Sequence, residues 1–319
     1  MPIIQPLVMF NQQFDSFEEL AVLVASHWNS DFRQLQSQKF QSTLYQAVLG
    51  PMLIVHARFG CHVQQRGITP AGMCSFAILH PDSPEMYWYG RKIGPQNLVS
   101  FPSDGEVDVF NQPGFSVFSF SFPTELLMTL FEQNGVPLLG EMLNYGNTEW
   151  EATTRQLNRI RFLLNLVVTG RIGNGGYYLL EEIKDILLSI LIHNLDSKCP
   201  KEKRSHLKKA QKFKQVIEYV HASEQSLLQI SDICEASQIS IRTLQTLFKH
   251  EVNMTPKQFL NGQRLYNAHK ELWHSDPSII KVTEIANKWG FWHMGQFAAD
   301  YQKTFGELPS DTLKYCQRD

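Results

Sequence analysis

The chain has few cysteines, and no two of them are close together. The five among its 319 residues are Cys61, Cys74, Cys199, Cys234 and Cys316. This spacing argues against a zinc site or a disulfide framework. The chain also lacks a basic, apolar leader, and its longest apolar stretch, near Ile186–Ile192, is far too short to span a bilayer. These absences predict a cytoplasmic protein with reduced thiols and no membrane partner.

Charge is scarce and unevenly divided along the chain. The formal net charge is −2, with 29 Lys and Arg against 31 Asp and Glu. Residues 1–199 hold 12 basic and 18 acidic side chains, whereas residues 200–319 hold 17 basic and 13 acidic ones. Because single cores rarely grow beyond about 250–300 residues, a chain of this length with 43% hydrophobic residues predicts two domains. The basic excess in the second domain suits phosphate groups.

Short apolar runs separated by Gly and Pro dominate the first 122 residues. After a segment with helical spacing, Phe17–Ser26, strand-length runs follow at Leu44–Leu49, Met52–Phe59, Met73–His80, Met86–Tyr89, Asn97–Phe101, Val107–Phe110 and Phe115–Phe122. Runs of this length with turn residues between them favour an antiparallel barrel or sandwich of the cupin type. We therefore expect an α+β chain with a cupin-like sensor domain over residues 1–150.

Two apolar stripes with steps of three and four residues predict an antiparallel helix pair over residues 151–196. The stripes are Leu157, Ile160, Leu164 and Val167, then Leu180, Ile183, Leu187 and Ile190. Two interpretations of these stripes stay open. They form either a homodimer interface or a core that packs on the barrel of the same chain. The polar segment Asp196–Arg204 contains a proline and a run of charges, and it predicts a linker over residues 197–204. The second domain then covers residues 205–319.

The last third of the chain contains the same pattern twice. The first copy comprises Asp232, Ile233, Cys234, Ile239, Ser240, Leu244, Phe248, Asn253 and Pro256, and the second comprises Glu284, Ile285, Ala286, Phe291, His293, Phe297, Tyr301, Gly306 and Pro309. The offset is 52 residues before the turn and 53 from Ser240 and His293 onward. A short helix, a tight turn and a second helix with apolar residues four apart are typical of a helix-turn-helix. Two such units predict a protein that reads two neighbouring stretches of DNA groove and is not an enzyme.

In the first unit, Leu244 and Phe248 are expected to pack the second helix on its own domain, with Ser240 as its N-cap. The candidate DNA-binding residues around this helix are Ser240, Ile241, Arg242, Thr243, Gln245, Thr246 and Lys249, together with Lys257 and Arg264 further along the chain. Arg pairs with guanine and Gln with adenine through two hydrogen bonds each. Arg242 and Gln245 are therefore the main candidates for direct base readout.

The second unit has few long donor side chains. Its outward positions are Met294, Gly295, Gln296, Ala298, Ala299 and Gln302. We expect this unit to act through phosphate contacts, DNA shape and methyl contacts, with His293 capping its helix and Lys288 and Lys303 nearby. For the aromatic run Trp289–Trp292, the spacing around a tight turn favours core packing over base stacking.

These motifs resemble those of the AraC/XylS family of transcription regulators over about residues 208–315. The residues that carry the resemblance are Ser240–Gln245, Phe248, Lys249, Thr255, Pro256, the joining run Arg264–Ala268, the run Trp289–Phe297, Tyr301, Phe305, Gly306, Pro309 and Ser310. Thr246 and Ala299 stand where the family commonly has Arg, and Asn253 replaces a turn Gly. The resemblance implies a transcription activator. In such a regulator, a bound ligand favours one arrangement of the domains on double-stranded promoter DNA. It also implies RNA polymerase and a second copy of the chain as partners, and no cofactor.

The N-terminal half resembles, more loosely, the branch of the family that includes the ethanolamine-operon activator. The matching segments are Gln64–Gly67, Phe76–Ile78, Tyr87–Gly90 and Phe101-Pro102. We expect a pocket for a small amphipathic effector, lined by aromatic side chains with one charged group. The candidate residues are Phe76, Tyr87, Trp88 and Tyr89, with Arg66 or Glu106. The alternative interpretation is that these aromatic side chains only fill the barrel.

Two rival functions stay open for the N-terminal half. A catalytic metal cupin fused to a DNA-binding module would use a close His-x-His pair, which His56, His62 and His80 do not form. Two of these histidines around a metal ion would favour that function. In the second rival, the N-terminal half serves only for oligomerisation and binds no ligand. A barrel filled completely by its own side chains would favour this second alternative.

Overall fold

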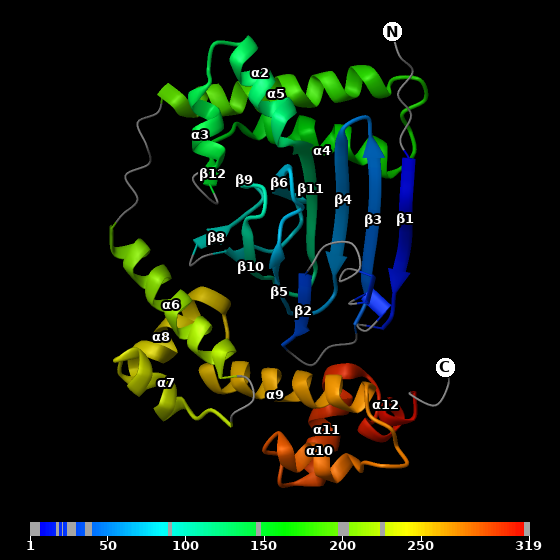
Figure 1. The fold of residues 1–319 in the computed structure, drawn as a ribbon, viewed down its shortest axis with the longest axis vertical. Coiled ribbons are helices and arrows are strands. Elements are labelled where there is room, and N and C mark those ends of the chain that lie inside the picture. Colours follow the sequence, from blue (N-terminus) through cyan, green and yellow to red (C-terminus); the bar gives the residue numbers. More distant parts are fainter. Residues whose placement is uncertain are drawn as a thin grey trace.

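The computed structural model describes residues 7–16, 19–20, 22–23, 30–35, 40–88, 91–144, 148–196, 204–223 and 227–315. The described elements form three tiers (Figure 1). Two β-sheets lie in the middle, with a helical layer on one side and the C-terminal helices on the other. This arrangement confirms the predicted α+β class with an antiparallel N-terminal part and an all-helical C-terminal part.

Every strand pair in the two sheets is antiparallel. The larger sheet has seven strands in the order β1 (Leu7–Phe14), β3 (Ser42–Leu49), β4 (Met52–Phe59), β11 (Phe115–Pro123), β6 (Met73–Leu79), β9 (Leu98–Phe101) and β12 (Thr148–Trp150). The smaller sheet has five strands in the order β2 (Ser30–Gln34), β5 (Val63–Ile68), β10 (Glu106–Phe110), β7 (Met86–Trp88) and β8 (Arg91–Ile93).

Strand β11 shows how the larger sheet separates two cores. Alternate side chains of a strand point to opposite faces. Phe118 and Phe120 therefore join the apolar cluster formed with the helical layer. Phe115 belongs to the cluster between the two sheets, with Val117 packed against it. The larger sheet is buried on both faces, which explains why its central strands are nearly continuous apolar runs.

The helical layer comprises α2 (Thr124–Gln133), α3 (Leu138–Asn144), α4 (Thr154–Val168) and α5 (Gly176–Asp196). The two predicted stripes of α4 and α5 lie in the cluster that covers the larger sheet, and each of their eight residues is at most 3% exposed. Of the two interpretations, this burial favours the core that packs on the barrel of the same chain. The apolar outer face of the sheet needs a cover, and the stripes supply it within one chain.

The C-terminal part consists of seven helices, within the described residues 204–223 and 227–315. They are α6 (Arg204–Ala222), α7 (Ile230–Ser237), α8 (Ile241–Val252), α9 (Pro256–Trp273), α10 (Val282–Lys288), α11 (Met294–Phe305) and α12 (Pro309–Tyr315). Of the predicted linker 197–204, only Arg204 is described, and it already begins α6. None of the helices in the described ranges combines the length and the apolar character that crossing a membrane requires.

The C-terminal helices pack directly on the smaller sheet. Tyr87 of β7 and Phe110 of β10 share an apolar cluster with Phe213 of α6. The backbone of α9 comes so close to the end of β2 that a Cβ added at Gly262 would lie 2.5 Å from the carbonyl oxygen of Leu35. Only glycine permits this approach. The division into domains at residues 150, 196 and 204 stays a prediction, and the parts on either side share a core.

Candidate nucleic-acid interface

The first helix-turn-helix is formed by α7 and α8. Gln238 ends α7 in the left-handed conformation (φ 52°), and the side chain of Ser240 caps α8 by accepting the backbone N–H of Thr243 at 3.2 Å. Leu244 and Phe248 are fully buried against α6 and α9. One face of α8 is therefore fixed to its own domain, as the spacing predicts.

The opposite face of α8 is exposed to solvent. Its exposed side chains are the predicted set Ile241, Arg242, Thr243, Gln245, Thr246 and Lys249. Thr246 donates its hydroxyl to the carbonyl of Arg242 at 2.9 Å, so this hydroxyl is engaged within the helix. In the described part of the chain, no side chain pairs with Arg242 or Gln245. Both long side chains are therefore available to reach base edges.

The second helix-turn-helix is formed by α10 and α11, with Gly290 in the left-handed conformation (φ 81°) between them. The predicted outward positions Gly295, Gln296, Ala299, Gln302 and Lys303 are exposed, whereas Met294 and Ala298 are half-buried. The Gln296 amide donates to the Asp300 carboxylate at 2.8 Å on the same helix. The second reading helix therefore presents a surface that is poor in free donors.

Three predicted roles around these helices differ in the structure. His293 occupies the N-cap position of α11, but its side chain makes no capping hydrogen bond. Lys288 forms an ion pair with Glu271 at 2.7 Å. Arg264 is half-buried and donates to the carbonyl of Leu228 at 2.6 Å, and burial lowers the pKa of its guanidinium. Arg264 thus holds the segment before α7 in place and does not project to a DNA surface.

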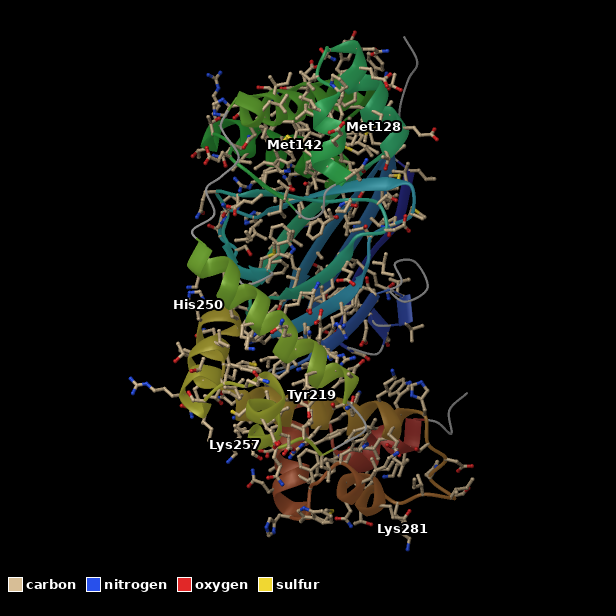
Figure 2. All side chains as sticks on the ribbon, turned by 60° about the vertical axis from the view of Figure 1, so that its left-hand side comes forward. Met128, Met142, Tyr219, His250, Lys257 and Lys281 are labelled. Atoms are coloured by element: carbon tan, nitrogen blue, oxygen red, sulfur yellow. The ribbon has the colours of Figure 1, made fainter. Side chains whose placement is uncertain are left out.

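Lys257 remains on the surface, at the start of α9. Figure 2 shows Lys257, His250 and Lys281 at the periphery of the C-terminal helices. The hydroxyl of Thr255 caps α9 by accepting the backbone N–H of Gln258. Lys257 therefore lies in a well-defined first turn, with its ammonium free to meet a phosphate.

Helix α9 connects the two units rigidly. Its N-terminal half contributes Phe259 to the core of the first unit, and its C-terminal half contributes Leu272 to the core of the second. The side chain of His269 contacts the hydroxyl of Tyr301, which in turn donates to Thr312. Because one continuous helix belongs to both cores, the relative position of α8 and α11 is set within the domain.

The aromatic run between α10 and α11 divides into two kinds of residue. Trp289 is half-buried and donates its indole N–H to Glu271 at 2.7 Å. Phe291 packs on Phe297, with 4.9 Å between ring centroids. Trp292, in contrast, is 69% exposed. The prediction of core packing holds for Trp289 and Phe291 and is wrong for Trp292.

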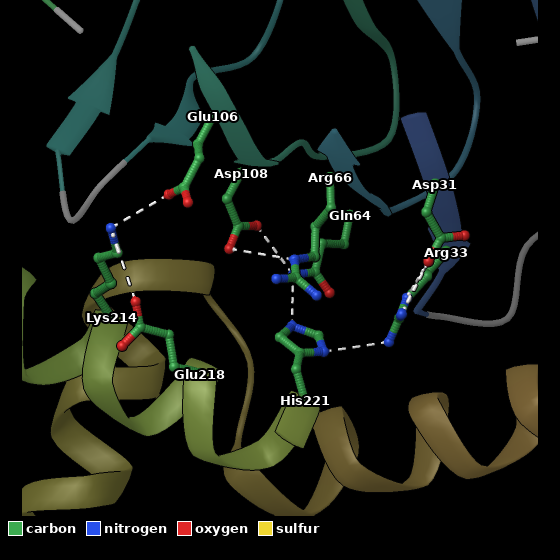
Figure 3. Close-up of polar contacts among 9 residues, drawn as sticks. All are labelled: Asp31, Arg33, Gln64, Arg66, Glu106, Asp108, Lys214, Glu218 and His221. Atoms are coloured by element: carbon green, nitrogen blue, oxygen red, sulfur yellow. Dashed lines mark hydrogen bonds and ion pairs between the residues drawn. The ribbon is translucent and has the colours of Figure 1, made fainter. Parts of the chain in front are cut away.

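A polar network that residue spacing does not predict links the C-terminal helices to the smaller sheet (Figure 3). His221 of α6 lies 3.2 Å from the Gln64 amide of β5 and 3.2 Å from the Arg33 guanidinium of β2. Gln64 also donates to Asp108 of β10 at 3.0 Å, and Arg33 forms an ion pair with Asp31 at 2.8 Å. One imidazole thus contacts two strands directly, and Gln64 extends the network to β10.

Further polar contacts extend this interface to α9 and α11. The hydroxyl of Tyr266 donates to Asp31 at 3.1 Å, and the amide of Gln34 donates to the backbone carbonyl of Thr304 at 2.6 Å. Burial raises the pKa of Asp108, which the hydrogen bond from Gln64 partly opposes. We use the name docking surface for these polar contacts together with the approach of Gly262 to β2. Both helix-turn-helix units are therefore in contact with the N-terminal part.

A cavity lies between the two sheets. Its volume is about 120 Å³, and part of it opens to solvent. Its polar lining is formed by Ser30, Gln65, Thr69, Ser75, Ser119 and Ser121, and the remaining lining is apolar, including Phe76. Among the described residues, no charged side chain lines this space. This volume is smaller than that of the usual small-molecule pocket, about 300–1,000 Å³, so only a small ligand fits.

Of the six predicted effector-binding residues, only Phe76 lines the cavity. Trp88 fills the core between the sheets, and Tyr87 points to the docking surface. Arg66 and Glu106 also face the C-terminal helices: Arg66 lies 3.9 Å from Asp108, and Glu106 pairs with Lys214 of α6 at 3.4 Å. Tyr89 lies outside the described residues. The prediction erred because alternation alone does not tell which face of a strand turns inward.

The three histidines that bear on a metal site do not gather at one point. His56 contacts Ser116 at 3.1 Å and stacks on Phe118, and burial lowers its pKa to about 4. Burial likewise lowers the pKa of His62 to about 4. In the described ranges, no three His, Cys, Asp or Glu side chains are placed to hold a metal ion. No observation here favours a catalytic metal cupin.

Comparison with known proteins identifies the C-terminal part. Residues 233–315 match the family described as a helix-turn-helix domain. The probable thc operon regulatory protein of Rhodococcus erythropolis is 38% identical over 98 residues, 31% of this chain and 30% of that protein. The XylDLEGF operon transcriptional activator of Pseudomonas putida is 31% identical over 139 residues, 44% of this chain and 43% of that protein. The chain therefore spans less than half the length of each of these two relatives.

A solved structure aligns over a greater length at lower identity. The AraC-like transcriptional activator CuxR matches 82% of this chain and 96% of its own, with 17% identity and a TM-score of 0.44. The relatives named here are not ethanolamine-operon activators, so that finer resemblance stays a prediction.

Proposed function

We propose that this chain is a transcription regulator of the AraC/XylS type that binds promoter DNA through α8 and α11. The observation that carries the proposal is the pair of exposed reading helices joined by one continuous helix, α9, in a region that matches a helix-turn-helix family. A recognition helix needs one face fixed to its domain and the other free for the groove. Both helices meet this requirement.

The two reading helices have different tasks in this proposal. α8 offers Arg242 and Gln245, whose side chains suit guanine and adenine edges. α11 offers glycine, alanine and an amide tied to Asp300, so its contribution rests on shape and apolar contacts. Lys257 and Lys303 supply phosphate contacts that are insensitive to sequence.

The cavity between the sheets is the proposed effector site. The hydroxyls of Ser75 on β6 and Ser121 on β11 lie 2.8 Å apart on its wall, and Ser119 precedes Ser121 by two residues on β11. The lining carries hydroxyl and amide groups without charge, so a small, uncharged, amphipathic molecule fits its chemistry. This open cavity also argues against the alternative of a ligand-free oligomerisation domain, which a filled barrel would have favoured.

The docking surface is the proposed route from effector to DNA. Strands β5 and β10 line the cavity with Gln65 and Val109, and their neighbouring residues Gln64 and Asp108 face α6. Adjacent residues of a strand point to opposite faces, so a shift of these strands moves both surfaces together. An effector then changes how firmly the reading domain is held. Contact with RNA polymerase and pairing with a second chain complete the proposed activator.

Selection of duplexes from random-sequence DNA with the full chain tests this function. We expect an enriched site, and affinity for it that falls steeply with salt, because each phosphate contact contributes about −0.9 to the slope of log K against log salt. Failure to enrich any sequence, or affinity independent of salt, would contradict the proposal. Transcription from a reporter carrying the selected site, with and without the chain, then shows the sign of regulation.

A further inference from the structure

The turn of the second helix-turn-helix contains one residue more than the turn of the first. The backbone N–H of Ile239 donates to Cys234 at 3.0 Å, and that of Phe291 donates to Ala286 at 2.9 Å, which is the same bond 52 residues later. After the turn, Leu244 donates to Ser240 and Phe297 to His293, both at 2.9 Å, with an offset of 53. The additional residue between the two matched bonds is Trp292.

Trp292 is not required for packing the turn. Phe291, the counterpart of Ile239, already packs against the core of the second unit, as Ile239 does in the first. Trp292 is 69% exposed, whereas Trp88 and Trp150 are at most 2% exposed. A small polar residue would satisfy the turn at least as well, because a large exposed aromatic gains little from the fold.

The position of Trp292 supplies what α11 lacks. This helix presents Gly295 and Ala299 outward, and the Gln296 amide is held by Asp300. Trp292 lies two residues before the helix begins at Met294, beside these bare positions. An indole offers a broad apolar face for deoxyribose rings and thymine methyl groups, and one N–H donor, without adding charge.

We propose that Trp292 is a DNA contact of the second unit, with its indole packed on the groove wall next to α11. This inference rests on the proposed DNA binding and adds the chemistry by which a donor-poor helix reads its half of the site. The preferred surface is a sugar edge with a thymine methyl, since both are apolar and reachable from a groove. The contact neutralises no phosphate.

The test compares variants of the full chain on the duplex selected with the parent. Trp292→Ala is expected to lower affinity about tenfold or more, in the range typical of aromatic contacts with bases. The slope of log K against log salt should stay unchanged, because no counterion is released by an indole. Trp292→Phe should retain most of the affinity. Tyr178→Ala is the matched control, since Tyr178 is an aromatic residue that is 64% exposed in the helical layer, on the other side of the sheets.

Replacing the selected thymines by uracil, which lacks the methyl group, should weaken the parent and leave Trp292→Ala unaffected. Equal affinity of Trp292→Ala and the parent would overturn the inference. So would normal binding by Trp292→Ala with loss of transcription, since the indole would then contact a protein. Trp292→Ala is expected to unfold at the same temperature as the parent. If Trp292→Ala does not fold, the affinity of Trp292→Phe for the duplex tests the inference instead. If the parent binds no duplex at all, the proposed function is wrong, and the inference about Trp292 is wrong as well.

Discussion

Exposure divides the residues of α8 into two sets. Leu244 and Phe248 are fully buried and anchor the helix, whereas Arg242 and Gln245 extend from its outer face. An anchoring residue affects DNA binding only through stability, while an outward one affects it through the contact itself. Single substitutions can therefore separate the two kinds of role.

Arg242→Ala and Gln245→Ala should each relax base preference in one half of the site. Each loss is expected to cost about 1–3 kcal/mol of binding free energy if the side chain makes two hydrogen bonds to a base. Lys257→Ala is the control, because a phosphate contact should weaken all sequences alike. Sequence profiles from a binding selection with each variant check this prediction. Indistinguishable profiles for the three would show that α8 does not read bases directly.

Arg264 was a candidate DNA contact, and the structure gives it a different task. Its guanidinium donates to Leu228, in the segment that leads into α7. Arg264→Met should lower the free energy of unfolding by about 1–3 kcal/mol, because a hydrogen bond from a charged group is lost. Chemical denaturation of the full chain measures this effect. A fully stable variant with weakened DNA binding would instead restore the role predicted from sequence.

Buried His62 and half-buried His56 give the protein a pH dependence of definite sign. Burial lowers the pKa of His56 and His62 to about 4 from an ordinary value near 6.5. Below pH 6.5 the unfolded chain binds protons that the folded chain does not, so stability should fall between about pH 6.5 and pH 4. His62→Gln should flatten this decline. Urea denaturation across that range tests it, and identical curves for variant and parent would contradict it.

At the scale of elements, the sequence predicted the helices and strands whose apolar residues face a single core. β4 has the predicted bounds, and the second helices of both units begin at the predicted positions. β5 escaped prediction because its polar residues, Gln64 and Arg66, are covered only when the C-terminal helices dock. The seam of α4 and α5 was correctly predicted as apolar, but the sequence left open whether the barrel of the same chain or a second chain covers it. An apolar stripe indicates that another surface covers it, but only the fold shows which surface that is.

The assignment of that seam to the core of one chain has a measurable consequence. Leu187 is 1% exposed in the cluster shared with the larger sheet. Leu187→Ala should lower the free energy of unfolding by about 2–5 kcal/mol, the usual cost of a cavity in a core. Asp185→Ala, an exposed position on the same helix, is the control. Near-parental stability of Leu187→Ala, together with dissociation in sedimentation, would return the seam to an interface between chains.

At the scale of the whole molecule, the docking surface joins the N-terminal sheets to the C-terminal helices. The sequence did not predict it, since the contacts that cross it join residues that are distant along the chain, such as Gln64 and His221. The predicted site residues of both helices are exposed as expected, apart from the half-buried Met294 and Ala298. The roles of Arg264 and Trp292 depend on which residues lie next to them in the fold, and residue spacing does not predict these neighbours. Long-range contacts thus determine the parts of the site that periodicity cannot.

Gly262→Ala should loosen the docking surface without touching a reading helix. Its Cβ would lie 2.5 Å from a backbone oxygen of β2, so α9 and β2 must separate. Gly295→Ala is the matched control, because a Cβ there meets no atom within 4 Å. Hydrogen exchange should show faster exchange in β2 and β5 for Gly262→Ala alone. Equal protection in both variants would show that the two parts are not held by this approach.

Hydroxyl-radical footprinting of the full chain on its selected duplex tests the central claim most directly. Because α9 fixes α8 and α11 in one domain, we predict two protected windows on the same face of the DNA, about one helical turn apart. Arg242→Ala should weaken the window of α8, and Trp292→Ala that of α11. A single window, or two windows that respond equally to both substitutions, would contradict the account.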